Sequence, residues 1–276
     1  MISDQLTGRA GRQPPVWAVA SSRKAFLAIL RRDLFVTGKD FWVLLIQVSL
    51  TPLFMLFIFA VVLSRQGFMR PNYVDLIQPG ILALAAFMTA VSTVAMPLVL
   101  EFGFTKEIED RLLAPLRTQW VAMEKLLIAM LRGLFATIVI YPLSWLVIGS
   151  APWQPDRLPL LLAVVLLGGW CGGGVGMTIA TLMPTHRINV VFNIILTPLI
   201  FTGCVQYPWH RLDTIRWFQI VTAVNPLTYC SEGVRAALVP HVQHIAPWIC
   251  LAVLSGTAII VTVTAVLSFA RRAARG

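Results

Sequence analysis

The sequence predicts an all-α membrane protein that crosses the bilayer with six transmembrane helices. The chain has 276 residues, of which 58% are hydrophobic and only 12% charged, whereas soluble domains average about 25% charged residues. Its apolar residues gather in runs of about 20, the length that a helix needs to cross ~30 Å of hydrocarbon. Too few polar residues remain to cover a globular core of this size, so lipid must face much of the chain.

Before the first apolar run, residues 1–40 are expected to form a cytoplasmic segment with one helix at the membrane interface. A helical pattern runs from Trp17 to Val36. Phe26 and Leu30 fall on one face of it, and Arg31 falls away from that face. Basic side chains beside an apolar face are typical of an amphipathic helix that lies among anionic headgroups. A plain cytosolic helix is the alternative.

Six runs are long enough to cross the bilayer, and together they form a transmembrane domain over residues 41–270. Backbone polar groups in lipid must pair within their own segment, so each run is expected to be a helix. In chain order the predicted spans are Phe41–Leu63, Pro79–Leu100, Leu126–Gly149, Leu158–Met183, Ile188–Val205 and Ala246–Ala270. Residues 271–276 then form a short cytoplasmic tail.

The basic residues outside the spans predict which side of the membrane each loop occupies. The N-terminal segment, the loops after the second and fourth spans, and the tail together hold 15 Lys and Arg, and the remaining loops hold six. Cytoplasmic loops carry the excess of Lys and Arg, so both termini are expected in the cytoplasm. This distribution explains the net charge of +10 better than a nucleic-acid surface, which would gather its charge in one patch.

The segment 207–240, between the fifth and sixth spans, does not fit a simple crossing. It is aromatic and broken by prolines. Asn225 followed by Pro226 predicts a helix N-cap with proline at the first helical position. That helix would run to about Leu238, only ~20 Å, which is too short to cross. We therefore predict short re-entrant helices that dip into the outer leaflet, with an ordinary extracellular loop as the alternative.

Arg132 is the one charged residue inside the predicted spans. Ion-coupled carriers usually place acidic or histidine side chains at mid-depth, and these spans have none. Arg132 lies about two turns from the start of the third span. We favour a side chain that snorkels to the inner interface over one that lines a substrate path.

The sequence lacks the motifs of a membrane hydrolase or an ATPase. It contains neither Gly-x-Ser-x-Gly nor a Gly-x4-Gly-Lys-Ser/Thr phosphate loop, so the chain does not split ATP by that motif. The run Gly168–Gly176 contains no serine. Glycines at this density in a membrane helix favour close helix packing, with a functional hinge as the alternative.

The cysteines and histidines predict no metal centre. None of the four cysteines forms Cys-x-x-Cys, and apolar neighbours favour a packing role for them. A bridge between Cys204 and Cys230 stays open. His241 and His244 are three residues apart, but no third ligand is close by.

The loop at 101–125 contains nine charged residues. The whole chain contains 22 Lys and Arg and 12 Asp and Glu. Its run KEIEDRLLAPL mixes charge with leucine. A short amphipathic helix ending near Pro115 would suit a groove on a soluble partner. A solvated connector between two spans is the alternative.

This order of elements resembles the membrane subunit of type-two ABC exporters, the permeases of drug, lipid-linked oligosaccharide and polysaccharide export. One shared motif is an acidic-basic stretch followed by Leu112-Leu113-Ala114-Pro115-Leu116, with Lys125 at the start of the third span. The other is Asn225-Pro226-Leu227-Thr228-Tyr229, followed by Glu232 and Arg235. Where the family often has Gly-Thr, this chain has Ile108-Glu109.

The resemblance implies a half-transporter in a bacterial inner (plasma) membrane. Two permease subunits, identical or related, would meet two separate ATP-binding subunits, which hold the ATP and Mg²⁺; this chain would hold no cofactor. The implied ATPase-coupling residues are Glu107, Glu109, Arg111, Leu112, Leu113, Pro115 and Leu116. The implied outer-gate residues are Asn225, Pro226, Tyr229, Glu232 and Arg235.

The sequence therefore predicts an ATP-driven export permease, which is itself no enzyme, for an amphipathic drug-like, lipid-linked or saccharide substrate. A stand-alone channel or secondary carrier is the second hypothesis. A membrane enzyme of lipid metabolism is the third. Acidic residues within the spans would favour the carrier, and a polar catalytic cluster at the interface would favour the enzyme; the sequence has neither.

Overall fold

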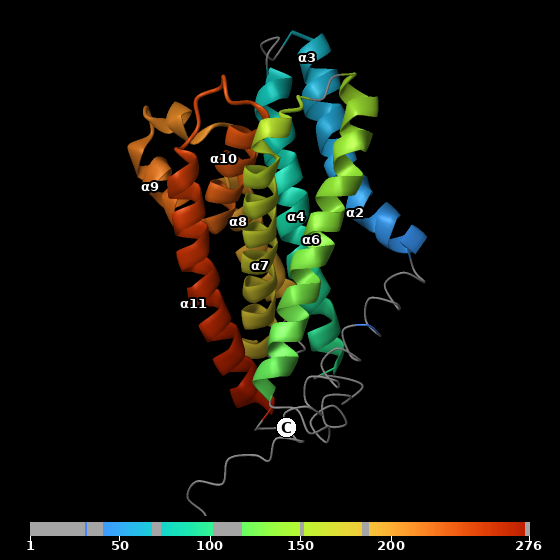
Figure 1. Ribbon diagram of the computed structural model, residues 1–276, viewed down its shortest axis with the longest axis vertical. Coiled ribbons are helices and arrows are strands. Elements are labelled where there is room, and N and C mark those ends of the chain that lie inside the picture. Colours follow the sequence, from blue (N-terminus) through green and yellow to red (C-terminus); the bar gives the residue numbers. More distant parts are fainter. Residues whose placement is uncertain are drawn as a thin grey trace, which may run out of the picture.

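The computed structural model describes residues 31, 41–67, 73–101, 118–149, 152–183 and 188–273, and its regular elements there are all helices. Figure 1 shows long helices along the vertical axis, with α9 and α10 at the upper end and the last turns of α11 at the lower end. We call these ends the hairpin end and the tail end. The predicted interfacial helix lies outside the described residues except for Arg31.

Five helices are long and apolar enough to cross a membrane, counted over the described residues. The first combines α2 (Phe41–Leu56), the π-helical turn η1 (Phe57–Val62) and α3 (Leu63–Arg65). The other four are α4 (Tyr73–Leu100), α6 (Thr118–Ile148), α7 (Leu158–Leu182) and α11 (Pro247–Ala273). These helices confirm the all-helical membrane fold.

The predicted fifth span corresponds to α8 (Ile188–Thr202), an apolar helix of 15 residues. At 1.5 Å per residue this is about 22 Å, shorter than the hydrocarbon layer. The described part of α8 is therefore too short to cross the hydrocarbon layer.

Two helices begin earlier than the spans predicted from hydropathy. α4 starts at Tyr73 instead of Pro79, and α6 starts at Thr118 instead of Leu126. Pro79 lies inside α4, which is common in membrane helices because neighbouring groups satisfy the freed carbonyl. A helix need not stop at the edge of the apolar run, so residues 118–125 of the predicted loop are helical.

The glycine run of α7 lets this helix contact its neighbours closely. A Cβ atom on Gly172 would lie 2.5 Å from the carbonyl oxygen of Phe87, and one on Gly176 would lie 2.5 Å from that of Val91. Both carbonyls belong to α4, so any larger residue would push the two helices apart. Gly174 faces Val261 of α11 in the same way. The structure thus confirms the predicted packing role.

Large apolar side chains lie on the outside of the bundle. α11 exposes Trp248, Ile259, Ile260, Val263 and Leu267. α2 likewise exposes large apolar side chains, which suits lipid or another membrane chain. All four cysteines are buried free thiols, including Cys204 and Cys230.

Between α8 and α11 the chain forms the short turn η5 (Trp209–Leu212), α9 (Arg216–Val224) and α10 (Pro226–Leu238). α10 packs against α4, α7 and α11, and eleven of its 13 residues are buried. This agrees with the helical hairpin predicted over 207–240. Its position in the outer leaflet stays a prediction.

Candidate functional site

Asn225 caps α10 as the sequence predicts. Its side-chain oxygen accepts a hydrogen bond from the backbone N–H of Leu227 at 2.9 Å, and Pro226 occupies the first turn. The Asn225 amide group also donates to the carbonyl of Leu199 at 2.7 Å and to the Thr202 hydroxyl at 2.8 Å. One side chain therefore starts α10 and ties it to the end of α8.

Two further side chains of α10 hold the hairpin together. The Thr228 hydroxyl contacts the carbonyls of Thr222, at 2.7 Å, and Thr202, at 3.1 Å. The Tyr229 hydroxyl donates to the carbonyl of Ala223 at 2.8 Å. These bonds fix the sharp corner between α9 and α10.

Glu232 and Arg235 form a fully buried ion pair on α10. They are three residues apart, which places them on neighbouring positions of the same helix face. Both carboxylate oxygens of Glu232 accept backbone hydrogen bonds, one from Trp209 N–H at 2.9 Å and one from Ile245 N–H at 3.1 Å. The carboxylate thus joins the start of η5 to the segment before α11.

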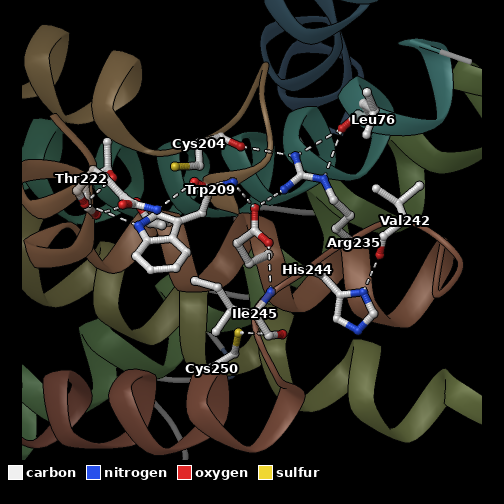
Figure 2. Close-up of polar contacts among 12 residues, drawn as sticks. Leu76, Cys204, Trp209, Thr222, Arg235, Val242, His244, Ile245 and Cys250 are labelled. Carbon is white, nitrogen blue, oxygen red and sulfur yellow. Dashed lines mark hydrogen bonds and ion pairs between the residues drawn. The ribbon is translucent and has the colours of Figure 1, made fainter. Parts of the chain in front are cut away.

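Arg235 makes the complementary contacts with carbonyl groups. Its Nε and Nη2 atoms donate to the carbonyl of Leu76 at 3.3 and 3.1 Å, and Nη2 also donates to that of Cys204 at 3.2 Å. Figure 2 shows the guanidinium between these two carbonyl oxygens. A buried charge is stable only when it is paired and hydrogen-bonded, and this pair meets both conditions.

The ion pair and its four backbone partners form what we call the hairpin hub: Leu76, Cys204, Trp209, Glu232, Arg235 and Ile245. The five predicted outer-gate residues are brought together on α10 and its cap. The sequence reasoning missed the other members because they contribute backbone atoms. Cys204 is the only non-glycine residue with positive φ, 50°, among the described residues, a backbone feature that the sequence does not show.

A second ion pair lies at the tail end. Lys125 Nζ lies 2.8 Å from Glu101 Oε1, and each side chain is only 9% exposed. Glu101 follows the last residue of α4, and Lys125 lies in the second turn of α6. We call this contact the tail-end pair. It joins the two helices that flank the predicted coupling loop.

The seven predicted coupling residues, Glu107 to Leu116, lie outside the described residues. What the structure describes is how the flanking helices are held. Besides the tail-end pair, Arg272 Nη1 on α11 donates to the carbonyls of Ala180, Thr181 and Met183, at 2.9, 3.0 and 2.6 Å. These are carbonyls at the C-terminus of α7, where a cation is favoured. Arg271 and Arg272 lie in the last turn of α11, so the helix continues into the predicted tail.

A cavity of 490 Å³ lies between α2, α4 and α6, with Ile200 of α8 at its wall. Its polar lining residues are Gln47, Thr51, Thr89, Ser92, Thr93 and Arg132. Arg132 is 14 residues from the start of α6 and 16 from its end. The structure therefore places Arg132 in a cavity wall at the middle of its helix, not near the helix start as the sequence suggested.

No group of three or more His, Cys, Asp or Glu able to hold a metal ion occurs among the described residues. The site therefore consists of hydrogen-bonded ion pairs at the two ends and a polar cavity between them. Such an arrangement can hold helices in register and bind a molecule within the membrane.

Several known transport permeases are similar in sequence to this chain. A putative transport permease, ycf38, of Cyanophora paradoxa is 27% identical over 228 residues, which cover 76% of this chain and 72% of that protein. The inner membrane transport permease YadH of Escherichia coli (strain K12) is 29% identical over 179 residues, covering 62% and 66%. The ycf38 permease of Porphyra purpurea is 24% identical over 174 residues, covering 59% and 55%. No solved structure matches the chain.

Residues 24–239 match the ABC-2 type transporter family. The matched region covers most of the chain and includes α10 with both charged residues of the hairpin hub. The relatives are named transport permeases, and the helical bundle has the length and composition that a membrane permease needs. The chain belongs to the ABC-2 type transporter family, as a transport permease subunit.

Proposed function

We propose that this chain forms one half of an outward pathway driven by ATP. A separate ATP-binding subunit would dock on the loop at 101–125, and a second permease chain would complete the pathway. The observation that supports this proposal best is the tail-end pair, because it fastens both ends of the predicted docking loop to the bundle.

The geometry suits transmission of force from that loop. A load applied to the loop would reach α4 and α6 together, since the buried contact between Lys125 and Glu101 joins them. α4 then runs to the hairpin end, where the carbonyl of Leu76 accepts hydrogen bonds from Arg235. A continuous helix is a stiff connection, so movement of the loop would be felt at the hairpin hub.

A second permease chain is supported by the side of the bundle that α2 and α4 line. The cavity opens there, and apolar residues of α2 are exposed beside it. A single chain leaves this polar cavity facing lipid, which is unfavourable. A second copy or a related chain would enclose it.

We propose that both termini face the cytoplasm of a bacterial cell and that the hairpin end faces outward. The excess of Lys and Arg in the tail-end loops supports this orientation. The relative YadH is named an inner membrane protein. Reporter fusions in the 101–125 loop should report a cytoplasmic position; an external position would refute the docking proposal.

The decisive experiment is co-purification with the ATP-binding subunit. Leu112→Asp or Leu113→Asp should abolish co-purification, because a charged side chain would enter an apolar groove. Gln66→Asp adds the same charge in an exposed turn at the hairpin end and should leave binding unchanged. Outward transport of an amphipathic, lipid-linked or saccharide substrate into inverted vesicles should then require ATP. Survival of co-purification in both leucine variants would refute docking on this loop.

A further inference from the structure

The cavity between α2, α4 and α6 combines one cation with hydrogen-bonding groups. Arg132 is the one charged residue among the described residues that line it. Thr89 and Ser92 of α4 lie three residues apart on one helix face, and Gln47 and Thr51 of α2 are four apart. The cavity thus receives polar side chains from one face of each of two helices.

The position of Arg132 along α6 indicates that the cavity lies deep in the membrane. α6 exposes Trp120 near one end and Trp145 near the other. Exposed tryptophans mark the two membrane interfaces. Arg132 is 12 residues from the first and 13 from the second, about 18 and 20 Å along the helix. An arginine side chain is much shorter than either distance, so its guanidinium stays near the bilayer centre.

A cation at this depth is costly unless protein groups, water or a ligand compensate its charge. Polar and ionisable residues inside membrane proteins face the interior or a water-filled cavity and mark ligand or ion pathways. The Thr93 hydroxyl donates to the Thr89 carbonyl at 2.7 Å. The other polar side chains of the cavity wall are the candidate ligand groups.

The lining also contains an apolar part, formed by Leu84, Met88, Met96 and Ile200. The cavity volume of 490 Å³ falls within the range of about 300–1,000 Å³ typical of small-molecule sites. A guanidinium binds phosphate and carboxylate with two parallel hydrogen bonds. We propose that this cavity binds an amphipathic anion, with Arg132 against its phosphate or carboxylate group and the apolar wall against its hydrocarbon part.

The assignment of the bound anion as the transported molecule rests on the proposed function. The existence of the binding site does not rest on it, because binding can be measured on the permease alone. Separate experiments therefore test anion binding and transport of the bound anion.

The first experiment measures binding to the full-length permease in phosphatidylcholine nanodiscs by native mass spectrometry. Dodecyl phosphate is the probe, and dodecylphosphocholine, with the same chain and no net charge, is the comparison. We expect the wild-type protein to prefer dodecyl phosphate. Arg132→Gln should weaken its binding at least about 10-fold and leave dodecylphosphocholine unchanged, since a hydrogen bond to a charged group is lost. Arg132→Lys should retain most of the preference.

The matched control is Arg65→Gln, which removes an exposed arginine of α3 at the hairpin end and should change neither probe. Equal binding of the two probes to the wild-type protein, or an unchanged preference in Arg132→Gln, would overturn the proposal. If Arg132→Gln fails to fold, Ser92→Leu fills the cavity without a change of charge. This variant should also lose dodecyl phosphate, and intact binding would overturn the proposal.

Two further arms identify the source of the anion. Competition by millimolar inorganic phosphate would assign the site to a water-soluble anion and overturn the amphipathic part. With the ATP-binding subunit added, dodecyl phosphate should stimulate ATP hydrolysis in the wild-type complex and not in Arg132→Gln. Binding without stimulation would identify a resident lipid and overturn the cargo assignment. Failure of the two subunits to associate would instead count against the proposed function alone.

Discussion

The hairpin hub and the tail-end pair each contain a buried carboxylate and a buried cation, but they bond differently. Glu232 and Arg235 lie on one helix and direct their other hydrogen bonds to backbone groups of four separate segments. Glu101 and Lys125 lie at the ends of two helices and contact each other side chain to side chain. The first pair organises several segments around one helix, and the second joins the end of α4 to the start of α6.

This difference indicates how each end can move. Pulling the hub apart would leave buried charges and several backbone groups without partners at the same time. The hairpin end should therefore move as one unit. The tail-end pair lies directly beside the predicted docking loop, so a load on the loop would reach this pair first. α4 reaches both sites, because Leu76 near its start accepts from Arg235 and Glu101 follows its last residue. We therefore expect rearrangement at the tail end and rigid-body displacement at the hairpin end.

The largest effect should come from breaking the hub. Arg235→Met leaves Glu232 as a buried unpaired charge and removes the donors that serve Leu76 and Cys204. Loss of one member of a buried pair typically costs about 3–5 kcal/mol of unfolding free energy. Chemical unfolding in detergent, followed by tryptophan fluorescence, would measure the loss.

Two controls sharpen this prediction. Arg216→Met removes an exposed arginine of α9 and should change stability by less than about 0.5 kcal/mol. The double variant Glu232→Leu/Arg235→Met should be more stable than Arg235→Met alone, since it leaves no unpaired charge. A cost below about 1 kcal/mol for Arg235→Met would contradict the central role of the hub.

Breaking the tail-end pair should have a smaller effect on stability. Lys125→Met removes the ammonium that donates to Glu101, and we expect a loss of about 1.5–3 kcal/mol, typical of a hydrogen bond to a charged group. The loop between α4 and α6 should also become more accessible, so trypsin should cleave after Lys106 or Arg111 faster than in the wild-type protein. A stability loss larger than that of Arg235→Met would contradict the expectation that the hairpin hub contributes more to stability than the tail-end pair.

The two regions also differ in how far the sequence predicts them. The start of α10 follows from Asn225 and Pro226, because a cap is a local arrangement of neighbouring residues. The backbone partners of Arg235 are carbonyl groups, one of them 159 residues away, and a carbonyl belongs to every residue type. Residue identity alone therefore does not specify the hub.

At the tail end, the sequence did not predict where α6 begins. Hydropathy marks where the apolar run of α6 begins, near Leu126, but the helix itself starts at Thr118. Hydrogen bonds along a helix continue into the polar region as long as the backbone permits. The early start places Lys125 within a helix, beside Glu101, and places Arg132 at mid-helix. Both consequences depend on tertiary structure that a hydropathy pattern does not contain.

The smallest effect should come from the cap of α10, which borders the hub without carrying charge. Asn225→Ala removes the acceptor for Leu227 N–H and the donors to Leu199 and Thr202, and should cost about 1–2 kcal/mol. Asn225→Ser retains a capping oxygen and loses only the amide donors, so it should recover part of this loss. Thermal unfolding and protease cleavage within 207–216 would measure both variants.

The pair of cap variants also tests whether the hairpin moves as a unit. If the hub alone holds the hairpin, Asn225→Ala should loosen the corner between α8 and α10 while the segment before α11 keeps its protection from protease. If transport and protease access both stay unchanged in Asn225→Ala, the predicted gating role of this residue is wrong. If the whole segment 207–245 becomes accessible, the cap and the hub act together, and the hairpin end is less rigid than its ion pair implies.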